Sequence, residues 1–222
     1  MRKILVVAPH PDDETLGCGG TLLKHREFGD ELFWLILTNI KDKAKWGERK
    51  IEEREKEIES VSNAYRFKEV FRLDIEPTKV KEFPFGKLVE MISNVVKAVK
   101  PDVVYVHNRS DVHSDHRVSF EAVMSAVKIF NNPYIRRILM YETLSETNFT
   151  PSLLENVFLP NYYVDISDFL DVKVQIAEIY KSEIKEHPFP RSKESIKALA
   201  ILRGSEANVK YAEAFILLRG IW

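Results

Sequence analysis

An apolar run near the start of the chain stops abruptly at a cluster of charged side chains. The run is ILVVA, residues 4–8, and the cluster is HPDDE, residues 10–14. A short β-branched run without a polar residue is typical of a strand that is buried on both faces of a parallel sheet. Ligands of open α/β sheets bind beyond the carboxyl ends of such strands. The position of the charged cluster therefore predicts a functional site at the end of the first strand.

The alternation of strand-like and helix-like segments predicts the fold class. Helical patterns are expected at about residues 15–29, 48–65, 85–99, 115–130 and 169–184, and further strands at 31–38, 68–73, 103–107 and 136–142. Strands that alternate with helices through short connections predict an α/β doubly wound sheet, that is, a Rossmann-like three-layer sandwich with a mostly parallel sheet. The 222 residues suffice for one hydrophobic core, so we expect a single domain over residues 1–222.

Two segments of the C-terminal part do not follow this alternation. EHPFPRSKES, residues 186–195, is expected to be a flexible loop, because its prolines interrupt helices and its charges favour solvent. The closing segment, KYAEAFILLRGIW, fits neither a helix nor a strand clearly.

Charge balance and cysteine content narrow the class of partner. The chain carries 33 basic and 34 acidic residues, so nothing predicts a nucleic acid or a membrane as partner, and a small molecule is expected. The single cysteine, Cys18, excludes an internal disulfide and fits a cytoplasmic location. The first apolar run ends at Pro9 and is too short for a signal peptide or a membrane span.

A second polar cluster follows the strand expected at 103–107. It reads HNRSDVHSDH, residues 107–116, and its last two histidines, His113 and His116, share a face if a helix has begun there. Together with His10 and the acids of the first cluster, they form a set of nitrogen and oxygen donors. Such donors suit Zn²⁺ or another divalent transition metal. The two clusters therefore predict a metal centre.

More acids are present than coordination would use. A catalytic metal site needs three protein ligands, a neighbouring base for its water, and acceptors that hold the ligand histidines. The spacing alone does not decide which of Asp12 and Asp13 is the ligand and which is the base.

Two other interpretations explain less of the pattern. Asp12 or Asp13 could cap the following helix, but capping does not account for a histidine beside three consecutive acids. The glycines of GCGG, residues 17–20, suggest a dinucleotide-binding fingerprint. They follow the acids, however, and these acids would repel a pyrophosphate. We therefore expect the glycines to let the first helix pack close to the sheet.

The ordered set of motifs resembles the LmbE-like, or PIG-L, family of zinc-dependent de-N-acetylases. HPDDE at 10–14 and HSDH at 113–116 resemble its two signatures, and RSDVHSDHR, FLPNYYVDIS and YAEAF resemble other parts of it, so the likeness extends over most of the chain. The chain departs from many relatives at SNAYRF, residues 62–67, and at the glutamate that ends YKSE, residues 180–183. These departures leave the subfamily and the substrate open.

The resemblance implies roles for individual residues. The residues that would bind the metal are His10, Asp13 and His116. Asp12 would be the general base, and Arg54 would contact the substrate. His113, steadied by Asp115, would act as general acid or as a cation that stabilises the tetrahedral intermediate. The acids that would support the site from outside are Glu14 and Asp111.

The implied activity is hydrolysis of an N-acetyl group from an N-acetylglucosamine-type sugar or sugar conjugate, with release of acetate. The implied cofactor is Zn²⁺ or another divalent transition metal, and the family also implies a homo-oligomer. Two alternatives remain: an amidase of the same family that acts on a thiol or other conjugate, and a metal-binding or nucleotide-binding α/β module without hydrolysis.

The sequence gives weaker indications of a functional role for the other histidines and for one tryptophan. His25 and His187 lack acidic companions at ligand spacing and are expected at the surface, whereas His107 is expected in the core or behind the ligands. Trp46 is expected in a loop after the second strand, where it could stack on a sugar, although aromatic residues more often pack in cores.

Overall fold

Seven strands form one sheet in residues 1–221, the part of the chain that this computed structural model describes. The strands are β1 (Lys3–Ala8), β2 (Glu31–Thr38), β3 (Glu69–Ile75), β4 (Val103–His107), β5 (Arg137–Tyr141), β6 (Tyr162–Asp165) and β7 (Ala212–Gly220). Their order is β3-β2-β1-β4-β5-β7-β6; β1 to β5 are parallel, and β7 is antiparallel to both of its neighbours. The expected α/β fold with a mostly parallel sheet is confirmed.

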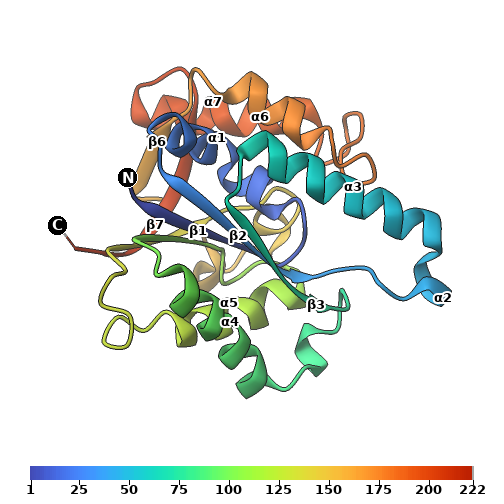
Figure 1. Cartoon of the computed structure of the whole chain (residues 1–222). Coiled ribbons are helices and arrows are strands. Elements are labelled where there is room, and N and C mark those ends of the chain that lie inside the picture. Colours follow the sequence, from blue (N-terminus) through green and yellow to red (C-terminus); the bar gives the residue numbers. More distant parts are fainter. Residues whose placement is uncertain (222) are drawn as a thin grey trace.

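Helices cover both faces of the sheet (Figure 1). The helices are α1 (Asp13–Glu27), α2 (Lys43–Trp46), α3 (Glu48–Tyr65), α4 (Phe85–Val99), α5 (Ser114–Ala126), α6 (Leu170–Ala177) and α7 (Lys193–Ala207), with short 3₁₀ turns at Val80–Glu82, Thr147–Phe149 and Leu154–Asn156. Figure 1 shows α1, α3, α6 and α7 on one face and α4 and α5 on the other. None of the described helices combines the length and apolar character that crossing a membrane requires.

The alternation of side chains along β1 supplies both halves of the core. Leu5 and Val7 pack with residues of α4 and α5, whereas Ile4 and Val6 pack with residues of α1 and α3. All four side chains are fully buried. The uninterrupted apolar run predicted this two-sided burial, because a strand covered on both faces needs no polar positions.

The two polar clusters lie where the strand order changes direction. β1 pairs with β2 on one side and with β4 on the other. The chain leaves β1 into α1 on one face of the sheet and leaves β4 into α5 on the opposite face (Figure 1). This divergence opens a crevice beyond the carboxyl ends of the two strands, which is the usual ligand position in doubly wound sheets.

The C-terminal part differs most from the sequence prediction. The helix expected at 169–184 ends at Ala177, and the loop expected at 186–195 ends at Ser192, whose hydroxyl caps α7 by accepting the Ser195 N–H. The sequence pattern does not predict β6, β7 or α7. β7 is a strand because it pairs with β5 and β6, both distant in sequence, and no local signal reports such pairing.

Glycines of α1 allow close approach to neighbouring side chains, as expected. A Cβ added at Gly17 would lie 2.1 Å from Cδ2 of Tyr141, a fully buried residue at the end of β5. A Cβ at Gly20 would lie 2.8 Å from Cβ of Ile166. Both positions therefore exclude any larger side chain unless the neighbour moves.

We expect Gly17→Ala to lower the free energy of unfolding by about 1–3 kcal/mol, the usual cost of overpacking a core. Urea unfolding followed by circular dichroism measures this change. Gly86→Ala is the matched control, because nothing lies within 4 Å of its added Cβ and alanine favours the helix. Equal stability of the two variants would contradict the packing role of Gly17.

Candidate active site

The HPDDE motif forms a tight turn between β1 and α1. Asp12 has φ 141°, a backbone conformation that is rare for a residue with a side chain. Its N–H donates to Oε2 of Glu14 at 3.1 Å, and its carbonyl accepts the N–H of Thr15 at 3.0 Å. The first turn of α1 therefore holds Asp12 in its strained conformation, and this fixes where the adjacent Asp13 leaves the turn.

Three ligand atoms from the two clusters converge. Nδ1 of His10 lies 3.2 Å from Nε2 of His116 and 3.4 Å from Oδ2 of Asp13, and this Oδ2 lies 3.2 Å from Nε2 of His116. Ligand atoms about 2.0–2.1 Å from a tetrahedral zinc ion lie about 3.3 Å from one another. The spacing and chemistry of this trio therefore fit a divalent transition metal.

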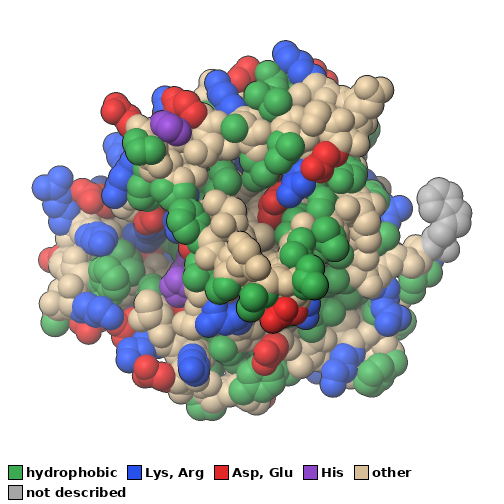
Figure 2. All heavy atoms as spheres, turned by 180° about the vertical axis from the view of Figure 1, so that it is seen from behind, with side chains coloured by type: hydrophobic (Ala, Val, Ile, Leu, Met, Phe, Trp, Pro, Cys, Tyr) green, Lys and Arg blue, Asp and Glu red, His purple; other side chains and the backbone are tan. Residues whose placement is uncertain are grey.

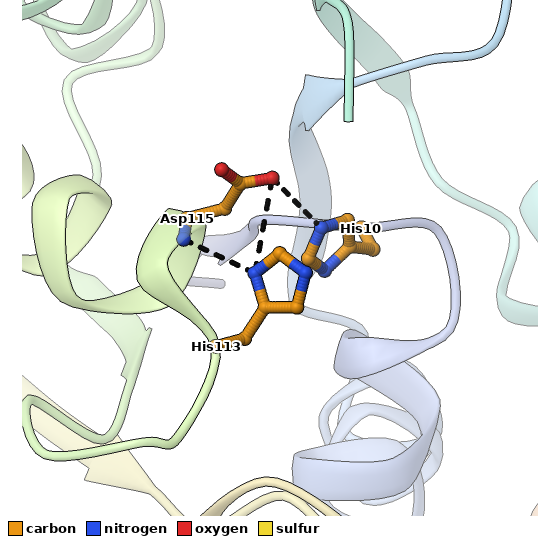
Figure 3. Close-up of side chains that lie close together, drawn as sticks. All are labelled: His10, His113 and Asp115. Atoms are coloured by element: carbon orange, nitrogen blue, oxygen red, sulfur yellow. Dashed lines mark hydrogen bonds and ion pairs between the residues drawn. The ribbon is translucent and has the colours of Figure 1, made fainter. Parts of the chain in front are cut away.

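Carboxylates outside the trio orient both imidazoles. Nδ1 of His116 lies 2.8 Å from Oδ2 of Asp111, so the other ring nitrogen, Nε2, faces the other two atoms of the trio. Nε2 of His10 lies 3.2 Å from Oδ2 of Asp115 (Figure 3), which leaves Nδ1 free in the same way. A carboxylate behind each histidine is the usual support of a metal ligand.

The contacts among these residues shift the pKa values of Asp13, His10 and His116. Burial favours the neutral carboxyl of Asp13, but His116 and His10 hold the pKa of Asp13 well below its usual range. Burial lowers the pKa of His10, yet its hydrogen bonds to Asp115 and Asp13 raise it to about 9. The pKa of His116 is also well above its usual value, because Asp13 and Asp111 outweigh burial. A metal ion would therefore have to displace protons from both histidines.

The contact between His113 and Asp115 differs from the expectation. The backbone N–H of Asp115 donates to Nδ1 of His113 at 3.1 Å, whereas the carboxylate lies 3.9 Å from that atom and closer to His10 (Figure 3). Burial and then the charge on His10 lower the pKa of His113 to about 4. Asp115 thus orients His113 mainly through its backbone, and the ring is neutral, with its proton on Nε2.

Arg191 contacts the proposed base and has no signal in the sequence pattern. Its Nη1 lies 2.7 Å from Oδ2 of Asp12 and 3.1 Å from Oε2 of Glu183, and its Nη2 lies 3.3 Å from Oε1 of Glu146. Burial raises the pKa of Asp12 to about 7, although Arg191 opposes the rise. Arg191 comes from the segment expected to be a flexible loop, so only the fold reveals its position.

Arg54 and Glu14 brace the turn from two sides. Nη1 of Arg54 donates to the carbonyl of Pro11 at 3.0 Å, and its Nη2 donates to Glu183 at 2.7 Å. The buried carboxylate of Glu14 accepts hydrogen bonds from Thr15 at 2.6 Å and Tyr180 at 2.9 Å, besides the N–H of Asp12. Glu14 therefore supports the turn and has no hydrogen bond to His10 or His116.

A cavity of about 220 Å³ opens onto this cluster. The residues that line it and bear on the chemistry are His10, Asp12, Trp46, Lys50, Arg54, His113, Glu146, Glu183 and Arg191. Oε2 of Glu146 is buried there without a hydrogen-bond partner among the described residues. The cavity therefore brings the proposed base, His113 and several hydrogen-bonding groups to one space.

Of the three remaining histidines, His25 differs from the expected surface position, whereas His187 and His107 lie as expected. His25 is buried, not at the surface, because its ring bridges Oδ2 of Asp30 at 2.8 Å and the hydroxyl of Tyr105 at 2.9 Å. His187 is exposed as expected. His107 is buried behind the site, with Nε2 2.6 Å from the carbonyl of His116.

Fold and site together define a class of α/β proteins. Two imidazoles and the Asp13 carboxylate form a candidate metal centre beyond the ends of β1 and β4, where the strand order changes direction, and the Asp12 carboxylate lies beside it. The family model of PIG-L, the GlcNAc-PI de-N-acetylases, matches residues 5–127. The chain belongs to this family.

Individual relatives agree with this assignment. The chain is 26% identical over 234 residues to the diacetylchitobiose deacetylase of Thermococcus kodakarensis, with 100% of this chain and 85% of the relative covered. Its structure is similar to that of a conserved protein of Thermus thermophilus, with TM-score 0.79, 27% identity and coverage of 100% and 97%. The N,N'-diacetylchitobiose deacetylase of Pyrococcus horikoshii shares the fold, with TM-score 0.75, 23% identity and coverage of 99% and 84%.

We expect the protein to bind one Zn²⁺ or Co²⁺ per chain and His116→Ala to lose this binding. Isothermal titration calorimetry after chelator treatment measures both. Affinity should rise with pH, because the raised pKa values of the histidines mean that binding must release protons. His187→Ala, which changes an exposed histidine, should bind as the wild type does. A wild-type protein that binds neither metal would contradict the assignment of the centre.

Proposed function

We propose that the protein is a metal-dependent deacetylase that hydrolyses the N-acetyl group of an N-acetylglucosamine-type sugar or sugar conjugate and releases acetate. The observation that carries the proposal is the convergence of His10, Asp13 and His116 beside a separate carboxylate, Asp12, at the opening of a polar cavity. Family membership and the named activity of the Thermococcus relative support the same reaction.

His10, Asp13 and His116 would hold the metal. When bound, a divalent cation supplies a Lewis acid that polarises the amide carbonyl and makes water more acidic. The chain supplies the base: Asp12 takes a proton from the attacking water, and its pKa of about 7 lies near the value that favours proton transfer at neutral pH. Arg191 holds the Asp12 carboxylate in place through its 2.7 Å contact.

His113 would act on the other side of the amide. Its Nδ1 accepts the N–H of Asp115, so Nε2 carries the proton of the neutral ring. This N–H can donate a hydrogen bond to the developing oxyanion. The proton for the leaving nitrogen is the one that Asp12 took from the attacking water. The C–N bond then breaks, the amine leaves with the added proton, and acetate remains.

The lining of the cavity suits a sugar. Glu146 offers a buried oxygen without a partner among the described residues, which could accept a hydrogen bond from a hydroxyl. Glu183 and Arg54 add further acceptors and donors. A hydroxyl-rich ligand can satisfy the free oxygen of Glu146, whereas an apolar ligand would leave it without a partner.

We expect Asp12→Asn to keep the metal and to lower kcat by about 10²–10⁴-fold, the usual contribution of a general base. Asp168→Asn, at an exposed aspartate, is the matched control and should retain activity. The measurement is acetate release from N-acetylglucosamine, N,N'-diacetylchitobiose and an N-acetylated thiol conjugate, together with metal content. Hydrolysis of the thiol conjugate alone would favour an amidase, and a metal-loaded wild type that hydrolyses nothing would favour a binding module.

Arg191→Met should lower kcat by about 10-fold or more, because the base loses its only guanidinium contact among the described residues and can turn away from the water. Metal content should stay unchanged, since Arg191 contacts none of the proposed ligands. Arg49→Met is the control, because Arg49 is 92% exposed. Unchanged kcat in Arg191→Met would show that Asp12 needs no such support.

A further inference from the structure

A second cavity lies at the amino ends of the strands, at the opposite edge of the sheet from the proposed catalytic cluster. This amino-end cavity measures about 150 Å³, and its walls include Arg2, which precedes β1, and the first residues of β4 and β5, Val103 and Arg137. It shares none of its described lining residues with the cavity at the catalytic cluster. The proposed hydrolysis therefore does not use this space.

Most of the wall is apolar. Leu139, Tyr162 and Val164 line it from the sheet, and Phe28, which follows α1 and is 68% exposed, lines it from the helix side. An apolar cavity of about 150 Å³ in another protein holds one molecule of benzene. The amino-end cavity therefore has room for an apolar group of about one ring in size.

Thr21 places a hydroxyl without a partner in this wall. The residue lies on α1 and is 1% exposed, and its Oγ1 has no hydrogen-bond partner within residues 1–221. A threonine inside a helix can bond the carbonyl four residues earlier, but Thr21 does not. A buried hydroxyl without a partner costs free energy, which a ligand that accepts its hydrogen would recover.

The charged side chains of the wall are all basic. No acidic residue is among the described residues that line the cavity. Arg2 pairs with Asp30 at 2.7 Å, and Nζ of Lys24 donates to the carbonyl of Asp165 at 2.8 Å. The side chain of Arg137, in contrast, has no hydrogen bond or ion pair to any residue that the structure describes. One guanidinium is therefore left for a ligand.

The guanidinium of Arg137 acts on the interior of this cavity. Arg137 and Leu139 are two residues apart on β5, so their side chains stand on the same face of the sheet, and Leu139 packs in the cluster on the α1 face. Burial lowers the pKa of His25, and the charges on Arg2 and Arg137 act in the same direction, although Asp30 opposes them. Since His25 also lines the cavity, the charge of Arg137 reaches this space.

The side of the molecule that holds the amino-end cavity carries further basic side chains. The N-terminus lies at the left of Figure 1, so this side is at the right of Figure 2, which shows Lys and Arg side chains beside hydrophobic surface there. A neighbouring hollow is lined by Arg136 together with Arg2 and Arg137 of the amino-end cavity. Basic groups at the entrance favour the approach of an anion.

We propose that the amino-end cavity binds a small monocarboxylate whose apolar part is about one ring in size. The carboxylate pairs with the guanidinium of Arg137, Thr21 donates its hydroxyl hydrogen to the ligand, and the apolar part lies against Leu139 and Tyr162. One carboxylate charge matches the one guanidinium that lacks a partner, whereas a phosphate monoester carries nearly two charges. This second site stands independently of the proposed deacetylase activity.

The test is calorimetry of the full chain, with its metal bound, using benzoate as the probe. Benzamide, a neutral molecule of the same shape, should bind about 10-fold more weakly than benzoate, and Arg137→Met should weaken benzoate binding by about 10-fold, the usual effect of losing a charged hydrogen bond. Thr21→Val, which keeps the shape of the side chain, should weaken it by about 3-fold. Arg49→Met is the control and should bind as the wild type does, because Arg49 is 92% exposed and lies outside the cavity.

A further variant separates the amino-end cavity from the catalytic cluster, where Arg191 could also attract benzoate. Arg191→Met should keep the wild-type affinity, and a loss in Arg191→Met instead of Arg137→Met would overturn the proposal by placing benzoate at the catalytic cluster. Inorganic phosphate that binds as tightly as benzoate would overturn the ligand class, because the apolar wall would then contribute nothing. A folded wild type without saturable benzoate binding would overturn the site itself. None of these results bears on acetate release, which tests the deacetylase separately.

Discussion

The carboxylate of Asp13 joins the two segments on which the site depends. Its Oδ2 accepts the backbone N–H of His10 at 2.8 Å and lies 3.2 Å from Nε2 of His116, a residue of α5. Asp13 and His116 are almost completely removed from water, and burying charges is unfavourable unless they are paired. The turn after β1 and the start of α5 must therefore be placed together, and Asp111 and Asp115 complete the pairing behind the histidines.

A second buried pair, far from the chemistry, sets the direction of α1. The helix breaks at Cys18, whose φ is −143°, and buried side chains bond the backbone on both sides of the break. Nζ of Lys173 donates to the carbonyl of Leu16 at 2.9 Å, and Glu213 accepts the N–H of Gly20 at 2.8 Å. Lys173 and Glu213 are also bonded to each other at 2.7 Å. The C-terminal part thus fixes the helix that begins at the HPDDE turn.

Local patterns located the two polar motifs better than they predicted the surroundings of Asp12. HPDDE and HSDH are compact motifs that end strands, so sequence order already places them at one edge of the sheet. Arg191 carries no such signal, because it follows two prolines in a charged segment and meets Asp12 only after the chain folds back. Glu183, where the chain departs from many relatives, contacts both Arg54 and Arg191.

The sequence by itself determined the parallel centre of the sheet, the helices that follow it and the two motifs at its edge, because apolar periodicity and strand ends are local properties. Only the tertiary structure decided that β7 is a strand, that Asp115 supports His10 more closely than His113, and that Thr21 and Arg137 line one cavity. Each of these depends on contacts between residues far apart in the chain, and no local pattern contains that information.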